Sequence, residues 1–289
     1  MSVCVFCLGE AVTWVRGAYH PTVRSHGPFD IERCSVCGST VTVPPPSSER
    51  QQAFYAQYED GQPPQLLRAR EDSPQVTWYT KCVDHIAAIA RPSGSFTWLE
   101  TAAGSGTFTR LFAERFPSSR GTALDYHARP AELNGIANVD WIQGDLSRGA
   151  VDDLGTYDVV AALAILEHVP DVDAFVASLV RRVRPGGTLF MTCPDAASLM
   201  ARALGTRWPY HLPGEHLHVP SAAGARALMT RVLDSQGRRA QPRVRPITIP
   251  YTVRYLAAYL GAAKPAKAVP KTWTVPVPAG ALEIAVTLD

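Results

Sequence analysis

Short apolar runs alternate with helical patterns through the middle of the chain, and this alternation predicts an α/β fold. The predicted strands cover residues 96–99, 121–124, 139–143, 157–163 and 188–192. Helical periodicity between them is clearest over residues 108–115 and 172–183. Strands that alternate with helices form a mostly parallel sheet, so this part of the chain is expected to hold one.

The flanking segments predict further strands and helices around this central unit. Strands are expected over residues 244–249 and 282–288. The expected helices cover about 49–59, 75–91, 196–204, 222–236 and 253–263. The prolines Pro44, Pro45 and Pro46 cannot continue a sheet, so they indicate a linker after the first segment.

The loop after the first central strand carries the clearest chemical signal. Glu100 ends the strand, and a turn of small residues with Gly104 and Gly106 leads into the next helix. Because these residues have almost no side chains, their backbone amides can approach a ligand closely. Glu100 suits a ligand with a positive end, and Ala102 would be strained if its φ were positive.

Two more acids and two short motifs follow later strands in a fixed order. Asp125 ends the second strand about 20 residues beyond the glycines, where nucleotide-binding crossovers place an acid for the ribose. Asp145 follows the third strand. Leu166-Glu167-His168-Val169 comes after the fourth strand, and Arg184-Pro185-Gly186-Gly187 precedes the fifth.

The cysteines predict a metal site. Four of the six form two Cys-x-x-Cys pairs, Cys4 with Cys7 and Cys34 with Cys37. Two such pairs can face each other and supply the four sulfur ligands that zinc prefers, which leaves no open position for catalysis. We therefore expect a structural zinc ion; disulfides, redox thiols and loss of the metal stay open as alternatives.

Taken together, the motifs between residues 80 and 235 resemble the class I S-adenosylmethionine-dependent methyltransferases. The resemblance is in particular to a bacterial small-molecule group with an N-terminal four-cysteine zinc ribbon. It implies a Rossmann-like seven-stranded methyltransferase sheet, mostly parallel with the last strand antiparallel. The family usually has a glycine where this chain has Ala102.

The resemblance also implies where the cofactor S-adenosylmethionine would bind. Glu100 is expected near its amino group, and the turn with Ala102, Gly104 and Gly106 near its methionine portion. Asp125 is expected to accept hydrogen bonds from the ribose hydroxyls. The other expected contacts, with the adenine and at the end of the fourth strand, are Tyr126, Asp145, Leu146 and Leu163.

Histidines are the candidate general bases, because an imidazole titrates near neutral pH. His168 follows the fourth strand at the edge of the sheet where ligands bind. His216 follows Glu215, which could orient it, and this pair resembles the acid–histidine pairs of some sugar C-methyltransferases. We expect His216 to be the base, with His168 as second candidate. Another histidine, His20, has no supporting context in the sequence.

Three regions are expected in the chain: a zinc-ribbon module over 1–45, a helical linker or lid over 46–95, and a methyltransferase core over 96–289 with an insertion at about 195–235. Of the 289 residues 46% are hydrophobic and 19% charged, with a net charge of +2. So small a charge does not favour a nucleic-acid or membrane surface. No apolar run approaches the roughly 18 residues of a membrane helix, and no secretory signal is recognisable, so we expect a cytoplasmic protein.

The expected activity is methyl transfer to oxygen or carbon of a small molecule, such as a sugar, a nucleotide-linked sugar or a secondary metabolite. The main alternative is an RNA base methyltransferase that grips RNA with its zinc ribbon. A non-catalytic scaffold with the same fold is a third possibility, which Ala102 supports. The sequence does not identify the acceptor or the oligomeric state.

Overall fold

A seven-stranded sheet forms the centre of the molecule in the computed structural model, which describes residues 2–21, 27–47, 49–51, 74–146, 149–253, 269–270 and 273–289. In spatial order its strands are β11 (Arg243–Thr252), β12 (Thr274–Thr287), β9 (Val183–Pro194), β8 (Tyr157–Leu163), β5 (Thr97–Thr101), β6 (Arg120–Asp125) and β7 (Val139–Gln143). The strands β9, β8, β5, β6 and β7 pair in parallel, whereas β12 is antiparallel to both of its neighbours, β9 and β11. The expected fold class is confirmed.

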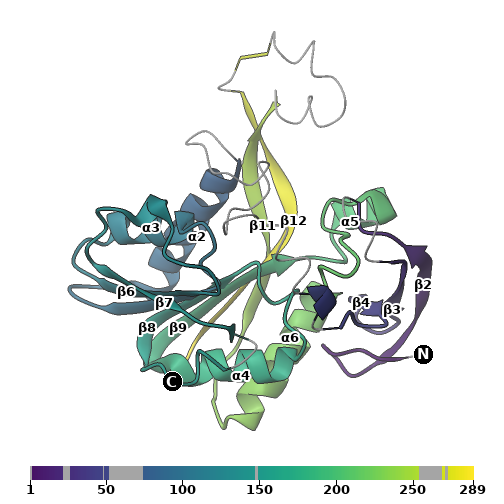
Figure 1. The fold of residues 1–289 in the computed structure, drawn as a ribbon, viewed down its shortest axis with the longest axis horizontal. Coiled ribbons are helices and arrows are strands. Elements are labelled where there is room, and N and C mark those ends of the chain that lie inside the picture. The colour runs from purple at the N-terminus through teal and green to yellow at the C-terminus, as the bar shows by residue number, and fades with distance from the viewer. Residues whose placement is uncertain are drawn as a thin grey trace.

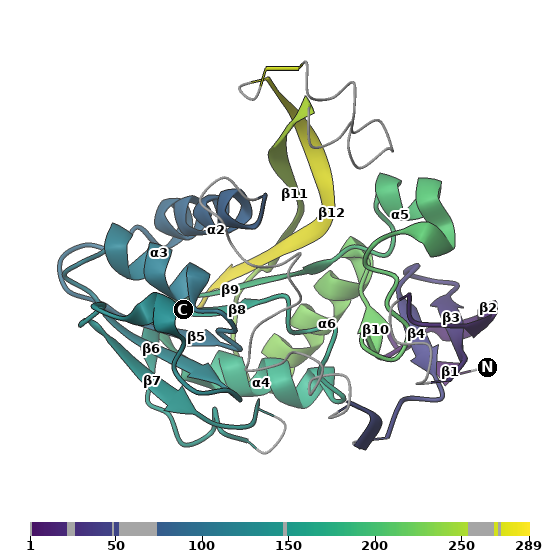
Figure 2. The same ribbon diagram turned by 45° about the horizontal axis from the view of Figure 1, so that its top comes forward.

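Helices cover both faces of this sheet (Figures 1 and 2). On one face lie α2 (Pro74–Ala90) and α3 (Thr107–Arg115), and on the other lie α4 (Val172–Arg182) and α6 (Ala222–Ser235). Strand β8 shows why both faces are needed. Its Val159 and Ala161 pack with residues of α2 and α3, whereas Val160 and Ala162 pack with residues of α4 and α6. A strand buried on both sides reads as a continuous apolar run, as residues 157–163 do.

Side-chain caps begin the two helices of the second face. The Asp171 carboxylate accepts a hydrogen bond from the amide of Ala174 at the start of α4. The Ser221 hydroxyl accepts one from the amide of Gly224 at the start of α6. Such caps satisfy amides that have no partner within the helix, which fixes where each helix begins.

The N-terminal segment forms a second, five-stranded sheet at the side of the molecule (Figure 1). Its first four strands are β1 (Ser2–Val3), β2 (Glu10–Ala18), β3 (Phe29–Cys34) and β4 (Thr40–Val43). The fifth, β10 (His218–Val219), comes from the segment between β9 and α6 and pairs antiparallel with β4. The same segment contains the short helix α5 (Leu199–Leu204), which ends in a 3₁₀ turn over Gly205–Arg207.

Most expected elements agree with the structure to within a few residues. Two strands begin earlier than expected: β9 begins five residues earlier and includes Arg184-Pro185-Gly186-Gly187, and β12 begins eight residues earlier. The helix expected over 253–263 and most of the one expected over 49–59 lie outside the described residues. Strands β11 and β12 form a long ribbon that extends away from the rest of the sheet (Figures 1 and 2). In the part of the chain that the structure describes, no helix has both the length and the apolar character needed to cross a membrane.

Candidate functional site

The loop between β5 and α3 contains three residues with positive φ. Ala102, Gly104 and Gly106 have φ of 56°, 53° and 74°. Glycine adopts this region freely, whereas alanine there costs about 1 kcal/mol. A Cβ atom on Gly104 would meet nothing within 4 Å, so this side of the loop is open. The chain thus keeps the conformation of a glycine-rich loop with a strained alanine at the first position.

Glu100, the carboxylate near the end of β5, is buried. The hydroxyl of Thr109, in the first turns of α3, donates a hydrogen bond to its Oε2 atom. Burial raises the pKa of Glu100 to about 8, although the bond from Thr109 acts in the opposite direction. The carboxyl is therefore mostly protonated at neutral pH in the ligand-free protein. A cationic group beside it would favour the ionised form.

Asp125, the last residue of β6, is tied directly to the loop. Its Oδ2 accepts a hydrogen bond from the Gly104 amide at 2.7 Å. Its Oδ1 accepts one from the His127 amide at 2.9 Å and lies 3.0 Å from His127 Nδ1. Because a carboxylate offers about four acceptor positions, Asp125 can accept at least one more donor, such as a hydroxyl.

The remaining residues expected at the cofactor also follow the ends of parallel strands. Asp145 and Leu146 come directly after β7 and are half-buried, and Leu163 ends β8 with its side chain in the core. Tyr126 follows β6, and the residue is 61% exposed. The carboxyl ends of adjacent parallel strands lie at one edge of a sheet, so the structure gathers these positions there.

His168 and His216 come together from distant parts of the chain. Their ring centroids are 4.8 Å apart and the rings are nearly perpendicular. His168 Nδ1 lies 3.2 Å from the carbonyl oxygen of Glu215, and His216 Nδ1 lies 2.8 Å from that of Tyr210. A carbonyl can only accept, so each Nδ1 carries the hydrogen and each Nε2 keeps a lone pair.

The two imidazoles differ in their surroundings. His216 is buried, and burial lowers its pKa to about 3, with the neighbouring His168 acting in the same direction. His168 is half-buried, and burial lowers its pKa too, whereas the charge of Glu215 acts in the opposite direction. Burial thus favours the neutral form of both rings, and His216 is the more deeply buried of the two.

The side chain of Glu215 contacts a histidine other than His216, which follows it in the chain. Its Oε2 lies 2.9 Å from Nε2 of His20, a buried residue of the N-terminal segment. Its charge favours a protonated His216, but the effect of burial is larger. Glu215 therefore links three parts of the chain: His20 by its side chain, His168 by its carbonyl, and His216 by the peptide bond.

Glu167 completes this group of buried ionisable side chains. Its Oε2 atom is buried without a hydrogen-bond partner among the described residues. Burial raises the pKa of Glu167 to about 8. One ligand-type atom from each of Glu167, His168 and His216 lies within 4.8 Å of the others. The three residues could share a proton or, if a cation entered, hold it.

Four residues of these sites were not expected from the sequence as site residues: Glu167, Thr109, His127 and His20. Glu167 directly precedes the candidate base His168. Thr109 and His127 bond to the two strand-end acids, and both stand close to the motifs that revealed those acids. A hydroxyl one turn into the helix after the loop is a signal that could have been used. His20 is 195 positions from Glu215, so no local pattern could have paired them.

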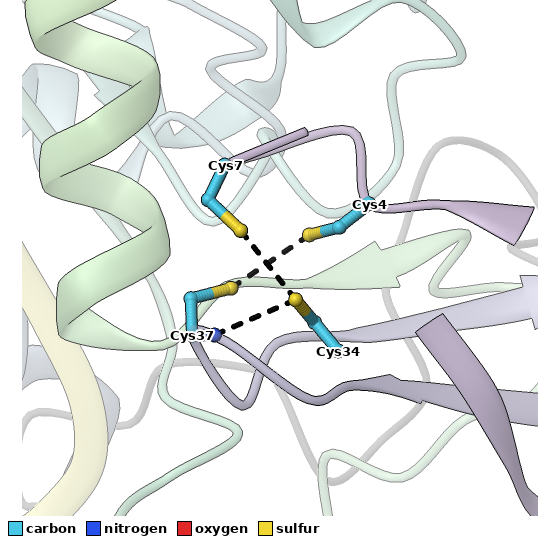
Figure 3. A group of neighbouring side chains, drawn as sticks. All are labelled: Cys4, Cys7, Cys34 and Cys37. Carbon is cyan, nitrogen blue, oxygen red and sulfur yellow. Dashed lines mark hydrogen bonds between the residues drawn. The ribbon is translucent and has the colours of Figure 1, made fainter. Parts of the chain in front are cut away.

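The four cysteines of the two expected pairs converge at one point (Figure 3). All four sulfur atoms lie within 4.8 Å of one another, with 3.7 Å between Cys4 and Cys37 and 3.4 Å between Cys7 and Cys34. Tetrahedral zinc with sulfur at about 2.3 Å requires sulfur atoms about 3.8 Å apart, so the donor set fits a zinc ion. The hydrogen bond between Cys4 and Cys37 lowers the pKa of Cys37 and raises that of Cys4, so it favours one thiolate in this pair.

The two cysteine turns have the same backbone design. The amide of Leu8 donates to the Cys4 carbonyl at 2.9 Å, and the amide of Gly38 donates to the Cys34 carbonyl at 3.0 Å. Both residues have positive φ, 62° for Leu8 and 79° for Gly38. The second turn uses glycine for this position, and the first uses a strained leucine.

Comparison with known proteins identifies the central part of the chain. A family model described as a methyltransferase domain matches residues 65–232. A trans-aconitate 2-methyltransferase of Azoarcus sp. (strain BH72) is 27% identical over 135 residues, which are 45% of this chain and 53% of that protein. A ubiquinone biosynthesis O-methyltransferase of Erwinia tasmaniensis is 31% identical over 100 residues, 32% of this chain and 40% of that protein. The chain thus spans about half the length, or less, of these curated relatives.

Among solved structures, the plantazolicin methyltransferase BpumL in complex with a monoazolic desmethylPZN analog and SAH has a similar fold. Its TM-score is 0.52 at 11% identity, over 84% of this chain and 91% of that one. The same enzyme with a triazolic analog and SAH gives a TM-score of 0.53. At this identity the likeness concerns the fold.

Proposed function

We propose that this chain, which belongs to the methyltransferase domain family, transfers a methyl group from S-adenosylmethionine to a small molecule. The observation that carries the proposal is the loop after β5. Its glycine-like conformation lies between two buried acids, Glu100 and Asp125, at the ends of adjacent parallel strands. Glu100 suits a cationic group and Asp125 suits ribose hydroxyls. S-adenosylmethionine carries both groups, the ammonium on its methionine portion and the ribose in its nucleoside.

In this proposal each residue of the sheet edge has a defined partner. Glu100 would lie near the ammonium group of the cofactor, and this positive charge would favour the ionised form of its carboxyl. Asp125 uses its remaining acceptor position for a ribose hydroxyl, while its bond to Gly104 keeps the loop in place. Asp145 and Leu146 would contact the adenine, Tyr126 would cover it, and Ala102, Gly106 and Leu163 would line the rest of the site.

The acceptor would bind beside His168 and His216. S-adenosylmethionine supplies a methyl group that is already activated on a sulfonium. When that group is transferred to an oxygen or carbon of the acceptor, the electron pair of the broken carbon–sulfur bond would stay on sulfur, and the acceptor's proton would have to go to a base. We assign that proton to Nε2 of His168 rather than of His216, because His168 is half-buried, whereas His216 is buried and its burial lowers its pKa to about 3.

A small-molecule acceptor is supported by the relatives, which are named for trans-aconitate and for ubiquinone biosynthesis. Sugars, nucleotide-linked sugars and secondary metabolites remain the classes we propose. The net charge of +2 does not favour RNA as the acceptor. RNA affinity measured across a salt series tests this alternative, because phosphate contacts would give a steep decline.

We further propose that Cys4, Cys7, Cys34 and Cys37 hold a structural zinc ion. Four thiolates leave no position for a substrate, so the ion would stabilise the two cysteine turns and take no part in methyl transfer. A site of reduced thiols also suits the cytoplasm, where we propose that the protein acts.

The substitution Asp125→Ala tests the cofactor site. It removes the acceptor for the ribose and for the Gly104 amide, so the affinity for S-adenosylmethionine should fall about 10-fold or more. Isothermal titration calorimetry with purified protein measures this change. Asp140→Ala, an exposed acid on the neighbouring strand β7, is the matched control. Equal affinity of the Asp125→Ala variant and the wild type would remove Asp125 from the site, and absence of binding to wild type would overturn the proposal.

A further inference from the structure

The segment that carries His216 is held by the N-terminal sheet. Strand β10 extends this sheet by pairing His218 with Val41 and Val219 with Thr40. Just before β10, the amide of Thr42 donates to the Leu217 carbonyl and the Thr42 hydroxyl donates to the His216 carbonyl, both at 2.7 Å. The backbone around His216 therefore has its position set by residues of the cysteine-containing segment.

His20 extends this connection to the side chains of the proposed acceptor site. Its Nε2 atom lies 2.9 Å from Glu215 Oε2, and only 5% and 12% of the two side chains are exposed. The carbonyl of Glu215 in turn accepts the Nδ1 hydrogen of His168. Two short contacts thus lead from His20 to the imidazole that we assign as the base.

We propose that His20 is a positioning residue of the acceptor site. By holding Glu215, it keeps the Glu215 carbonyl where it fixes the ring orientation and tautomer of His168, with Nε2 as the basic nitrogen. Its role in methyl transfer rests on the proposed function, whereas its effect on His168 does not. The N-terminal segment would then contribute a residue to the acceptor site as well as the four cysteines of the proposed zinc site.

Solvent has little access to the contact between His20 and Glu215, because both side chains are mostly buried. A cavity of about 10 Å³ lies between the N-terminal sheet and the segment before β10, and Thr42, Tyr210, Pro213 and His216 are among its lining residues. Such a volume holds about one water molecule. Loss of the imidazole would remove a hydrogen bond from a mostly buried carboxylate, and Glu215 would be expected to shift.

Three variants separate positioning from simple attachment of the module. His20→Ala removes the contact with Glu215. His20→Gln keeps an amide nitrogen near the position of Nε2 and should restore most of the function. Arg231→Gln is the matched control, because Arg231 of α6 binds the carbonyls of Val5 and Phe6 and so fastens the same module away from Glu215.

Kinetics on the zinc-loaded full chain give the first readout. We expect His20→Ala to lower kcat about 10-fold, since a small displacement of a base is costly, with the Kd of S-adenosylmethionine within about twofold of wild type. Arg231→Gln should keep the wild-type kcat. Equal losses in the His20→Ala and Arg231→Gln variants would overturn the proposal, because they would show general loosening of the module.

Nuclear magnetic resonance gives a readout that does not depend on activity. Long-range ¹H–¹⁵N spectra of the histidine rings report which nitrogen carries the hydrogen. His168 should show the Nδ1–H form in wild type, His20→Gln and Arg231→Gln, and a mixture of forms in His20→Ala. An unchanged His168 signal in His20→Ala would overturn the proposal even if no acceptor were known, and failure of cofactor binding alone would leave this measurement intact.

Discussion

At the scale of single residues, the molecule concentrates unfavourable features at one place. Ala102 adopts a φ of 56°, and the neighbouring acid Glu100 is buried with its pKa raised to about 8. Strain and burial of this kind persist when the surrounding structure enforces them, and they occur often at ligand sites. Each can be tested without knowledge of the acceptor.

Replacing Ala102 with glycine should stabilise the protein. The substitution removes the steric cost of positive φ, which outweighs the added freedom of the unfolded chain, so we expect a gain of about 0.5–1 kcal/mol. Urea unfolding measures the change. Ala103→Gly is the control, because positive φ does not occur at this neighbouring residue and the substitution should destabilise. A loss of stability in the Ala102→Gly variant would contradict the strain at this position.

Cofactor binding should release a proton from Glu100. With a pKa of about 8, this carboxyl is mostly protonated at pH 7, and a bound ammonium lowers that pKa. Binding heats measured in buffers of different ionisation enthalpy should therefore show nearly one proton released near pH 7 and less near pH 9. The same titration with Glu100→Gln should lose the buffer dependence; proton uptake by the wild type would contradict the assignment.

At the scale of elements, the carboxyl ends of the parallel strands define the edge of the sheet where ligands bind in open α/β folds. Strands β5, β6, β7 and β8 each deliver expected site residues to one edge of the sheet, because successive parallel strands run in the same direction. The apolar runs, the glycines and the strand-end acids were enough to predict this arrangement. Alternation of buried residues on both faces of β8 explains why a run such as 157–163 could be read as a central strand.

Other contacts of the candidate site could not be predicted from the sequence. The pairing of β10 with β4 joins residues about 180 positions apart, and a two-residue strand has no periodicity to detect. The contact between His20 and Glu215 has the same character. Burial, which makes His216 a weaker base than expected, depends on packing from several segments and cannot be read from the residues around it.

At the scale of the whole molecule, one sheet connects the proposed zinc site with the proposed acceptor site. If zinc holds the two cysteine turns, its removal should loosen β1 to β4, and β10 with them, since β10 pairs with β4. Chelation followed by hydrogen exchange should therefore expose the amides of Thr42 and Val219, while amides of β5 and β8 stay protected. Protection of the N-terminal sheet that is the same with and without metal would contradict a structural ion.

Elemental analysis should find one zinc per chain. The cysteine site accounts for it, and the variant Cys34→Ser should lose it. If elemental analysis of the wild type found a second divalent ion that was absent from the Glu167→Gln variant, that ion would be bound by Glu167, His168 and His216. That result would contradict the assignment of His168 as the general base.

The position of β12 has a consequence for how the molecule is assembled. This strand is the last one of the large sheet along the chain, yet it lies inside the sheet, between β9 and β11. During synthesis, the edge of β9 that pairs with β12 stays unpaired until residues 274–287 have left the ribosome. The edge of β11 that pairs with β12 stays unpaired for the same time. Closure of the sheet is therefore a late, long-range event, and chains cut short before residue 274 would present an open edge prone to aggregation.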